Sequence, residues 1–196
     1  MTPATLPPSP VAGLRTVALT RGDAARLQRF FDDNPAYFLA VQGEPAGAGT
    51  ARDELTGTPP PGMPYSQLWH VGYVDDATGR MAAFAGIVTD LVAEGVCHIG
   101  LFIVENARHG NGDAPRLYAG LEDWARAHGA AWMRLGVVVG NARGQRFWSR
   151  CGFLPVRLRE GYAMGQRTNT VQVMVKPLAE RTLVDYLALV ERDRPD

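Results

Sequence analysis

The chain has 196 residues, of which 46% are hydrophobic, and its twenty basic side chains balance twenty acidic ones. This length and composition favour a single domain with one sizeable core. The balanced charge, without a run rich in Lys or Arg, argues against a nucleic-acid partner. The apolar runs are too short to span a membrane, and the first residues lack the pattern of a signal peptide, so we predict a cytoplasmic protein with no membrane partner.

The first third of the sequence predicts a leader, a strand and a helix. Four prolines occur within residues 1–12, which we expect to form a disordered or extended leader. A strand at 14–19 and a helix from about 22 to 33 follow, and Pro35 ends the helix. The chain beyond it is rich in Gly and Pro and predicts a long loop with a short helix near 50–56. Such loops are either mobile or part of a binding site.

The middle of the chain predicts an antiparallel meander followed by a helix. Apolar or β-rich runs at 66–74, 79–91 and 97–104 are separated by turn residues, which is typical of adjacent strands. Apolar residues at steps of three and four over 114–128 predict a helix, with a proline in its first turn and a glycine after its end. The last strand of the meander therefore leads into a helix through a short turn.

The last third predicts a buried strand at 131–139, a helix at 142–150 and strands near 153–159 and 170–176. The segment 179–196 contains an amphipathic helix. Its apolar stripe either docks on the body of the protein or serves a dimer contact, so we expect a monomer or a homodimer.

Cys97 and Cys151 are the only cysteines in the sequence. Neither lies in a CxxC motif or in a cluster of His and Cys. We therefore expect neither a disulfide framework nor a structural zinc site, and we predict no metal.

Two glycines, Gly110 and Gly112, lie where the strand at 97–104 gives way to the next helix. A glycine turn at a helix N-terminus exposes unpaired N–H groups and lets a phosphate approach the backbone. The turn therefore predicts an anion site, most simply for a pyrophosphate, although the glycines could also serve the geometry of the turn alone. A dinucleotide fingerprint would need a third glycine where Pro115 stands, and no Gly-Lys-Ser/Thr sequence follows for a P-loop.

With this glycine turn and a second motif that follows it, the sequence resembles the GNAT superfamily of acyl-CoA-dependent N-acetyltransferases. The family pattern of Gln or Arg, two residues, Gly, one residue, then Gly or Ala falls on residues 109–114 (HGNGDA), after a strand that ends at Val104. A second family motif follows at 141–153 (NARGQRFWSRCGF), with an asparagine, a small residue and an aromatic pair at matching spacing. The resemblance is clear over residues 97–154.

The resemblance implies an α/β (α+β) fold with a mixed, mostly antiparallel central sheet of about seven strands flanked by helices. Residues 13–178 would form the acetyltransferase domain, and 179–196 would add a C-terminal helix packed on it. It also implies acetyl-CoA as co-substrate, with its pyrophosphate on the glycine turn and its pantetheine arm paired like an added strand with Phe102 and Val104. The implied cofactor-binding residues are Phe102, Val104, His109, Gly110, Asn111, Gly112, Asp113, Ala114, Asn141, Phe147 and Trp148.

His98 is the candidate general base. By strand alternation it shares a face with Phe102 and Val104, and it occupies the register at which the histone-acetylating branch of the family has its glutamate. Its imidazole would titrate near pH 6.5, which suits proton removal from an amine. A strand histidine bonded to its neighbours is the alternative. Gly100, on the same strand, marks either a bulge or a packing accommodation.

Three positions depart from the family pattern. His109 replaces the Gln or Arg, with Arg108 beside it, and Asp113 stands where the family has an aliphatic residue. Asp113 could cap the helix, or it could face the phosphates and repel them. Trp148 occupies the position of a tyrosine acid, and an indole N–H cannot take that role. Another tyrosine, Tyr162 or Tyr118, or solvent would then protonate the thiolate.

The resemblance implies an N-acetyltransferase that moves an acetyl group from acetyl-CoA to a primary amine of a small molecule or an amino terminus. An acyl-CoA sensor without turnover is the alternative. The segment from residue 30 to 65 would bound the acceptor, and it offers aromatic and acidic side chains such as Tyr37 and Asp53 without a recognisable motif. The sequence does not identify the acceptor.

Overall fold

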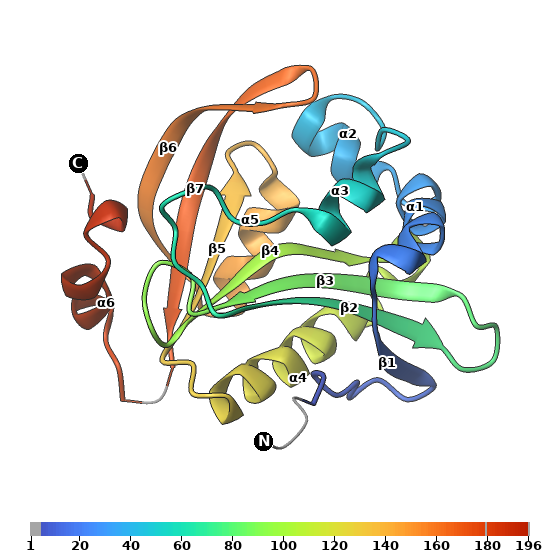
Figure 1. Ribbon diagram of the computed structural model, residues 1–196, viewed down its shortest axis with the longest axis horizontal. Coiled ribbons are helices and arrows are strands. Elements are labelled where there is room, and N and C mark those ends of the chain that lie inside the picture. The colour runs from blue at the N-terminus through green and yellow to red at the C-terminus, as the bar shows by residue number, and fades with distance from the viewer. Residues whose placement is uncertain (1–4, 179, 196) are drawn as a thin grey trace.

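A computed structural model describes residues 5–178 and 180–195 (Figure 1). The helices and strands are, in chain order, β1 (Leu14–Ala18), α1 (Ala24–Asp33), α2 (Ala36–Gln42), α3 (Thr50–Thr56), β2 (Gln67–Asp75), β3 (Met81–Thr89), β4 (Val96–Val104), α4 (Asp113–Ala127), β5 (Trp132–Val138), α5 (Ala142–Arg150), β6 (Leu154–Met164), β7 (Arg167–Pro177) and α6 (Leu183–Leu189). Short 3-10 turns lie at Arg21–Asp23, Asn106–Arg108 and Glu191–Asp193.

Seven strands form one sheet in the order β1-β2-β3-β4-β5-β7-β6. The neighbours β4 and β5 run parallel, and the other described pairs are antiparallel. The mixed, mostly antiparallel sheet of seven strands predicted from the sequence is thereby confirmed.

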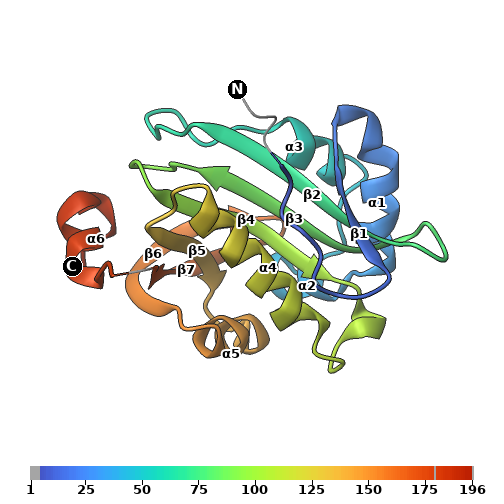
Figure 2. The ribbon, with the colours of Figure 1, turned by 90° about the horizontal axis from the view of Figure 1, so that it is seen from below.

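Helices cover both faces of this sheet (Figure 2). Leu117, Leu121 and Trp124 of α4 and Trp148 of α5 belong to the core on one face. Helices α1, α2 and α3 pack on the other face, α1 and α2 through aromatic side chains and α3 through Ala51 and Leu55. Helix α6 lies over β5, β6 and β7. Within the described ranges, no helix is long and apolar enough to cross a membrane.

The predicted elements are present, with two differences in extent. The chain expected to be a loop after Pro35 continues at once as α2, because Phe38 and Val41 are buried. Pro35 sits at the N-cap of this second helix, where its missing N–H costs nothing. Strands β6 and β7 extend well beyond the predicted ranges 153–159 and 170–176 and form a hairpin with its turn near Gly165. The tip of this hairpin is polar and shows little alternation of apolar and polar residues, so the sequence did not indicate it.

For residues 5–12, of the disordered or extended leader expected at 1–12, the structure shows chain without helix or strand over 5–10 that packs on the protein. The Trp124 indole donates a hydrogen bond of 2.6 Å to the Thr5 carbonyl. The Pro10 ring and the Pro8 carbonyl lie so close to Gly120 that a Cβ there would come within about 3 Å of both. This segment therefore packs along α4; residues 1–4 lie outside the described part of the chain.

The C-terminal segment is fastened by a buried carboxylate. Asp193 has no exposed surface and accepts hydrogen bonds from Arg134 (2.7 and 3.1 Å), Arg159 (2.7 Å) and the Tyr186 hydroxyl (2.5 Å). Burial acts to raise the pKa of Asp193, but the hydrogen bonds and positive charge of Arg134, with those of the other donors, outweigh it and hold the pKa well below its usual range.

Removal of this carboxylate should destabilise the protein strongly, because Arg134 would stay buried without its partner. Asp193→Ala should lower the free energy of unfolding in urea at pH 7 by about 3 kcal/mol or more. Since the pKa is depressed in the folded state, the contribution of Asp193 is present above the unfolded pKa of about 4 and is lost as the pH falls further. Glu191→Ala, which removes an exposed pair with Arg194, is the control and should cost at most about 1 kcal/mol. Equal effects of the two variants would contradict this role.

Candidate active site

A β-bulge at Gly100 reverses the alternation of side chains along β4. Ile87 of β3 pairs with Ile99 and the next residue, Gly86, pairs with Leu101, so Gly100 has no partner on β3. Before the bulge Ile99 faces α4, whereas after it Val104 faces α4 and Leu101 faces α1.

His98 therefore lies on the opposite face from Phe102 and Val104. Ile99, its neighbour, belongs to the core against α4, and Phe102 and Val104 pack with that same core. The prediction that His98 shares their face is wrong, because it assumed unbroken alternation across Gly100.

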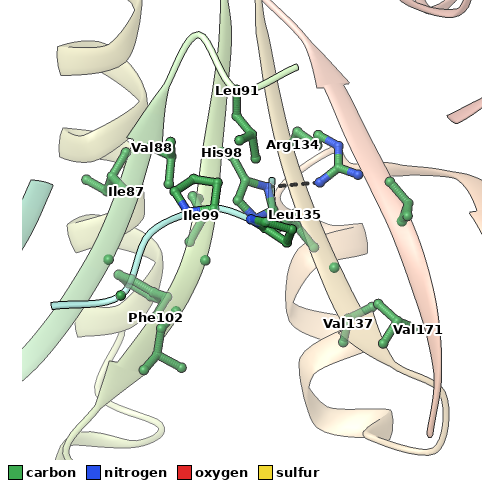
Figure 3. A pocket seen from close by; sticks show the side chains of 18 of the residues that line it. Ile87, Val88, Leu91, His98, Ile99, Phe102, Arg134, Leu135, Val137 and Val171 are labelled. Carbon is green, nitrogen blue, oxygen red and sulfur yellow. Dashed lines mark hydrogen bonds between the residues drawn. The ribbon is translucent and has the colours of Figure 1, made fainter. Parts of the chain in front are cut away.

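Strands β4 and β5 separate just after Ile99. They pair only where Val96–Ile99 meets Trp132–Leu135, and within the described residues 100–104 have no strand partner on the β5 side. The Glu105 N–H donates to the Ala82 carbonyl of β3 (2.8 Å), so by alternation the N–H groups of Phe102 and Val104 point into the gap. Figure 3 shows Phe102 and Val137 on the two sides of this gap, with His98 and Arg134 at its closed end.

A slot of about 250 Å³ opens at the wide end of the gap. The stacked rings of Phe102 and Phe147, with centroids 6.1 Å apart, form part of its wall. Of the predicted cofactor-binding residues, it is lined by Phe102, Val104, His109, Ala114, Asn141, Phe147 and Trp148. Asn141 also caps α5, because its side-chain oxygen accepts the Gly144 N–H at 3.0 Å.

The other predicted residues form the turn at the N-terminus of α4. Gly110 and Gly112 have φ values of +86° and +81°, which L side chains rarely adopt, and no atom lies within 4 Å of a Cβ placed on either. Asn111 lies between them. The glycines are thus required by the backbone, and they also leave open space beside unpaired N–H groups of the helix end.

Arg108 and Asp113, charged side chains at positions where the sequence departs from the family pattern, form an ion pair with each other. Arg108 forms ion pairs with Asp75 (2.7 Å), Asp113 (3.2 Å) and Glu105 (3.4 Å). Asp113 is buried and turned toward Arg108, and Gly112, not Asp113, occupies the N-cap of α4. The predicted capping by Asp113 is therefore wrong, and Arg108 is held by carboxylates.

Histidine and arginine side chains border the slot. A ring nitrogen of His109, Nε2, lies 2.8 Å from the Val104 carbonyl and donates to it, since a carbonyl only accepts. Burial lowers the pKa of His109, and Arg143 lowers it further against the effect of that hydrogen bond. Arg143 is an exposed cation lining the slot, which the sequence analysis missed. Its place two residues after Asn141, in the first turn of α5, was the available signal.

The environment of His98 disfavours the predicted role as general base. Its Nδ1 lies 3.2 Å from Nη1 of Arg134 (Figure 3), and because a guanidinium only donates, Nδ1 is an acceptor and the neutral ring carries its proton on Nε2. Burial, together with the charge of Arg134, lowers the pKa of His98 to about 3. The expected titration near pH 6.5 is therefore wrong, and the imidazole binds a further proton poorly at neutral pH.

A second, larger cavity of about 650 Å³ lies over the sheet. Its lining includes Gly86 on β3, His98 and Gly100 on β4, and the segment 57–61 between α3 and β2. Figure 1 shows the chain between α3 and β2, drawn in teal, passing across this side of the sheet. The residues that line both the cavity and the slot are Tyr37, Phe102, Asn141 and Trp148. The two spaces therefore meet at the gap between β4 and β5.

Glu54 of α3 was missed by the sequence analysis. It lines the larger cavity, and a Cβ at Gly86 would lie 2.5 Å from its Oε1, so the carboxylate lies directly over β3 beside the bulge. Burial raises the pKa of Glu54. Burial also raises the pKa of Tyr37 to about 12, and the charge of Glu54 adds to this, which places the two groups near each other.

The tyrosines considered as replacements for an acid at Trp148 differ in position. Trp148 is buried among rings, with Tyr118 at 5.4 Å and Phe153 at 5.3 Å between centroids. Tyr118 lines neither the cavity nor the slot, and burial raises the pKa of its hydroxyl. Tyr162 lines the larger cavity, whereas Tyr37 lines both spaces.

A family model described as "Acetyltransferase (GNAT) family" matches residues 16–153, more than half of the chain. The chain belongs to this family. The resemblance of residues 97–154 to it is confirmed, and membership makes the protein an acetyl-CoA-dependent acyltransferase.

Solved GNAT structures share this fold at low sequence identity. The ribosomal-protein-S5-alanine acetyltransferase of Vibrio fischeri has 13% identity and a TM-score of 0.65, over 88% of this chain and 97% of that one. The ribosomal-protein-S18-alanine N-acetyltransferase of Escherichia coli has 17% identity and a TM-score of 0.60, over 87% and 97%. The yncA protein of Salmonella typhimurium, solved with its cofactor acetyl-CoA, has 16% identity and a TM-score of 0.57, over 87% and 96%. Among curated proteins, none matches the sequence significantly.

The residues of this GNAT chain fit acetyl-CoA. The open glycine turn suits a pyrophosphate, and the free N–H groups of Phe102 and Val104 suit the amide groups of a pantetheine arm in the gap. Across residues 5–178 and 180–195, no group of three or more His, Cys, Asp or Glu side chains could hold a metal ion.

Substitution of Gly112 should weaken acetyl-CoA binding, because the added Cβ would occupy the open space of the turn where the phosphates are expected. Gly112→Ala should raise the dissociation constant measured by calorimetry by about tenfold or more. Gly129→Ala is a matched control at the other end of α4, with φ +85° and the same open surroundings. If both variants bind acetyl-CoA alike, the turn does not hold the phosphates.

Proposed function

We propose that this protein transfers an acetyl group from acetyl-CoA to a primary amine of a small molecule or an amino terminus. The observation that carries the proposal is the meeting of the slot with a second cavity that contains a desolvated carboxylate, Glu54. A ligand in the slot and an amine in the cavity would come together at Tyr37, Phe102, Asn141 and Trp148. The two ribosomal-protein alanine acetyltransferases of similar fold support an amino terminus as one option.

Acetyl-CoA, when bound, supplies an acetyl group whose carbon–sulfur bond is exchanged for a carbon–nitrogen bond, so the amine must lose a proton. An alkyl amine with a pKa near 10 is mostly charged at neutral pH, and a base beside it is useful. We assign this role to Glu54. Its carboxylate is acceptor-only when ionised, faces the cavity next to the bulge, and is a stronger base than an exposed glutamate because burial raises its pKa.

Tyr37 is the proposed proton donor on the side of the leaving group. With a pKa raised to about 12, its phenol keeps its proton at neutral pH, and it lines both the slot and the cavity. It would thus protonate the thiolate in place of Trp148, whose indole N–H cannot act as that acid. His98, with its proton on Nε2, is proposed to orient the acceptor as a hydrogen-bond donor.

The sequence also allowed an acyl-CoA sensor without turnover, and membership of an acetyltransferase family speaks against it. The two functions differ in one observable. An enzyme given acetyl-CoA and an amine releases free CoA thiol, whereas a sensor binds acetyl-CoA and releases none. A cytoplasmic location and a monomeric or homodimeric state stay predictions.

Glu54→Gln should separate catalysis from cofactor binding. We expect kcat to fall by about 100-fold, since general-base contributions are of this order, while calorimetric affinity for acetyl-CoA is unchanged. In the wild type, kcat should fall as the pH drops through the pKa of Glu54, because the carboxylate must be ionised, and this acidic limb should be absent in the variant.

The control is Asp123→Asn, which neutralises an exposed carboxylate of α4 that lines neither the cavity nor the slot and should leave kcat and its pH profile unchanged. His98→Ala should keep the acidic limb. An acidic limb that persists in Glu54→Gln and disappears in His98→Ala would return the role of base to His98.

A further inference from the structure

We propose that the acceptor amine also carries a carboxylate, and that the basic end of the larger cavity, formed by Arg159 and Arg192, binds it. This substrate class rests on the proposed acetyl transfer. Arg159 comes from β6 and Arg192 from the 3-10 turn Glu191–Asp193, and both residues line the cavity.

The cavity has opposite charges at its two ends. Glu54 lies over Gly86 of β3, whereas the arginines line the cavity from β5, from β6 and from the C-terminal segment. Because the strands follow the order β3-β4-β5-β7-β6, the carboxylate and Arg159 are separated by the whole width of the site. A molecule with an ammonium and a carboxylate group matches this arrangement in one orientation, with its amine toward Glu54 and the gap.

The positive charge at the basic end exceeds what the protein neutralises. Asp193 is shared by Arg134 and Arg159, so one carboxylate faces two guanidinium groups. His98 is neutral there, since its pKa lies near 3. No described carboxylate lies within ion-pair distance of Arg192, an exposed arginine among the residues that line the cavity.

The C-terminal segment is held in place without using all the N–H groups of Arg159 and Arg192. The segment is held through backbone carbonyls, because Arg159 Nη2 donates to the Arg192 carbonyl at 2.7 Å and Arg157 donates to those of Arg192 and Arg194 at 3.1 Å. Both hydrogen bonds of Arg159 to described groups leave from Nη2, to Arg192 and Asp193. Its Nη1 and the Arg192 guanidinium are thus left for a ligand. A guanidinium fork matches a carboxylate in shape and charge.

The test compares acids with their amides on the same amine. Each of the protein amino acids and a set of dipeptides would be assayed as the free acid and as the C-terminal amide. Release of CoA thiol would give kcat/KM, and calorimetry on the protein with CoA would give the dissociation constant without turnover. We expect the best acids to exceed their amides by about tenfold or more in both measurements.

The variants assign that preference to the arginine. Arg192→Ala should reduce the ratio of acid to amide to about threefold or less, and Arg192→Lys should retain part of it. The control Arg194→Ala removes an arginine of the same segment that does not line the cavity, and it should keep the wild-type ratio.

Several results would overturn the inference. They are amides that bind and react as well as acids in the wild type, an acid preference that survives Arg192→Ala, and a preference for aminoalkyl phosphates over every acid. Failure of the proposed acetyl transfer can be told apart from failure of this inference, because acetyl-CoA would then bind but no amine would cause release of CoA thiol. Calorimetry of acids against amides decides the carboxylate site even in that case.

Discussion

The site depends on the early end of hydrogen bonding between β4 and β5. The strands pair over four residues each, and the bulge at Gly100 then turns β4 so that the N–H groups of Phe102 and Val104 face a gap. Backbone groups in the interior of a sheet need partners, so an open gap of this kind favours a ligand that supplies them. His109 and Ala114, which flank the glycine turn of α4, line the slot together with Phe147 and with Phe102 and Val104 of the gap. A single chain-like ligand therefore has contacts available at all three places.

The bulge also determines what lies on the far side of the gap. It places His98 against Arg134, away from the slot, and leaves Glu54 over Gly86 as the carboxylate nearest the bulge. Arg192 lines the larger cavity, and Asp193 links Arg134 and Arg159, so the C-terminal segment is part of the wall of this cavity. The helix that follows the family domain therefore has a chemical consequence in addition to its packing.

Local sequence signals predicted most of the fold and singled out residues that the structure brings together at the slot. Periodicity located the helices at 114–128 and 142–150, and Gly110 and Gly112 marked a turn whose positive φ values only glycine adopts easily. The failures involve contacts between distant parts of the chain. The face of His98 depends on the pairing of β4 with β3, and its pKa depends on Arg134. Nothing within α3 indicates that Glu54 lies over Gly86. Nothing in the proline-rich sequence of residues 5–12 indicates that this segment packs along α4.

Hydrogen exchange at single amides tests most directly whether the gap receives the cofactor. NMR would compare exchange rates of the β4 amides in the free protein and with saturating acetyl-CoA. We expect the amides of Phe102 and Val104 to exchange rapidly in the free protein and to become protected by acetyl-CoA, while those of Leu101 and Ile103, bonded to β3, are slow in both states. Binding of acetyl-CoA that leaves exchange at Phe102 and Val104 unchanged would contradict it.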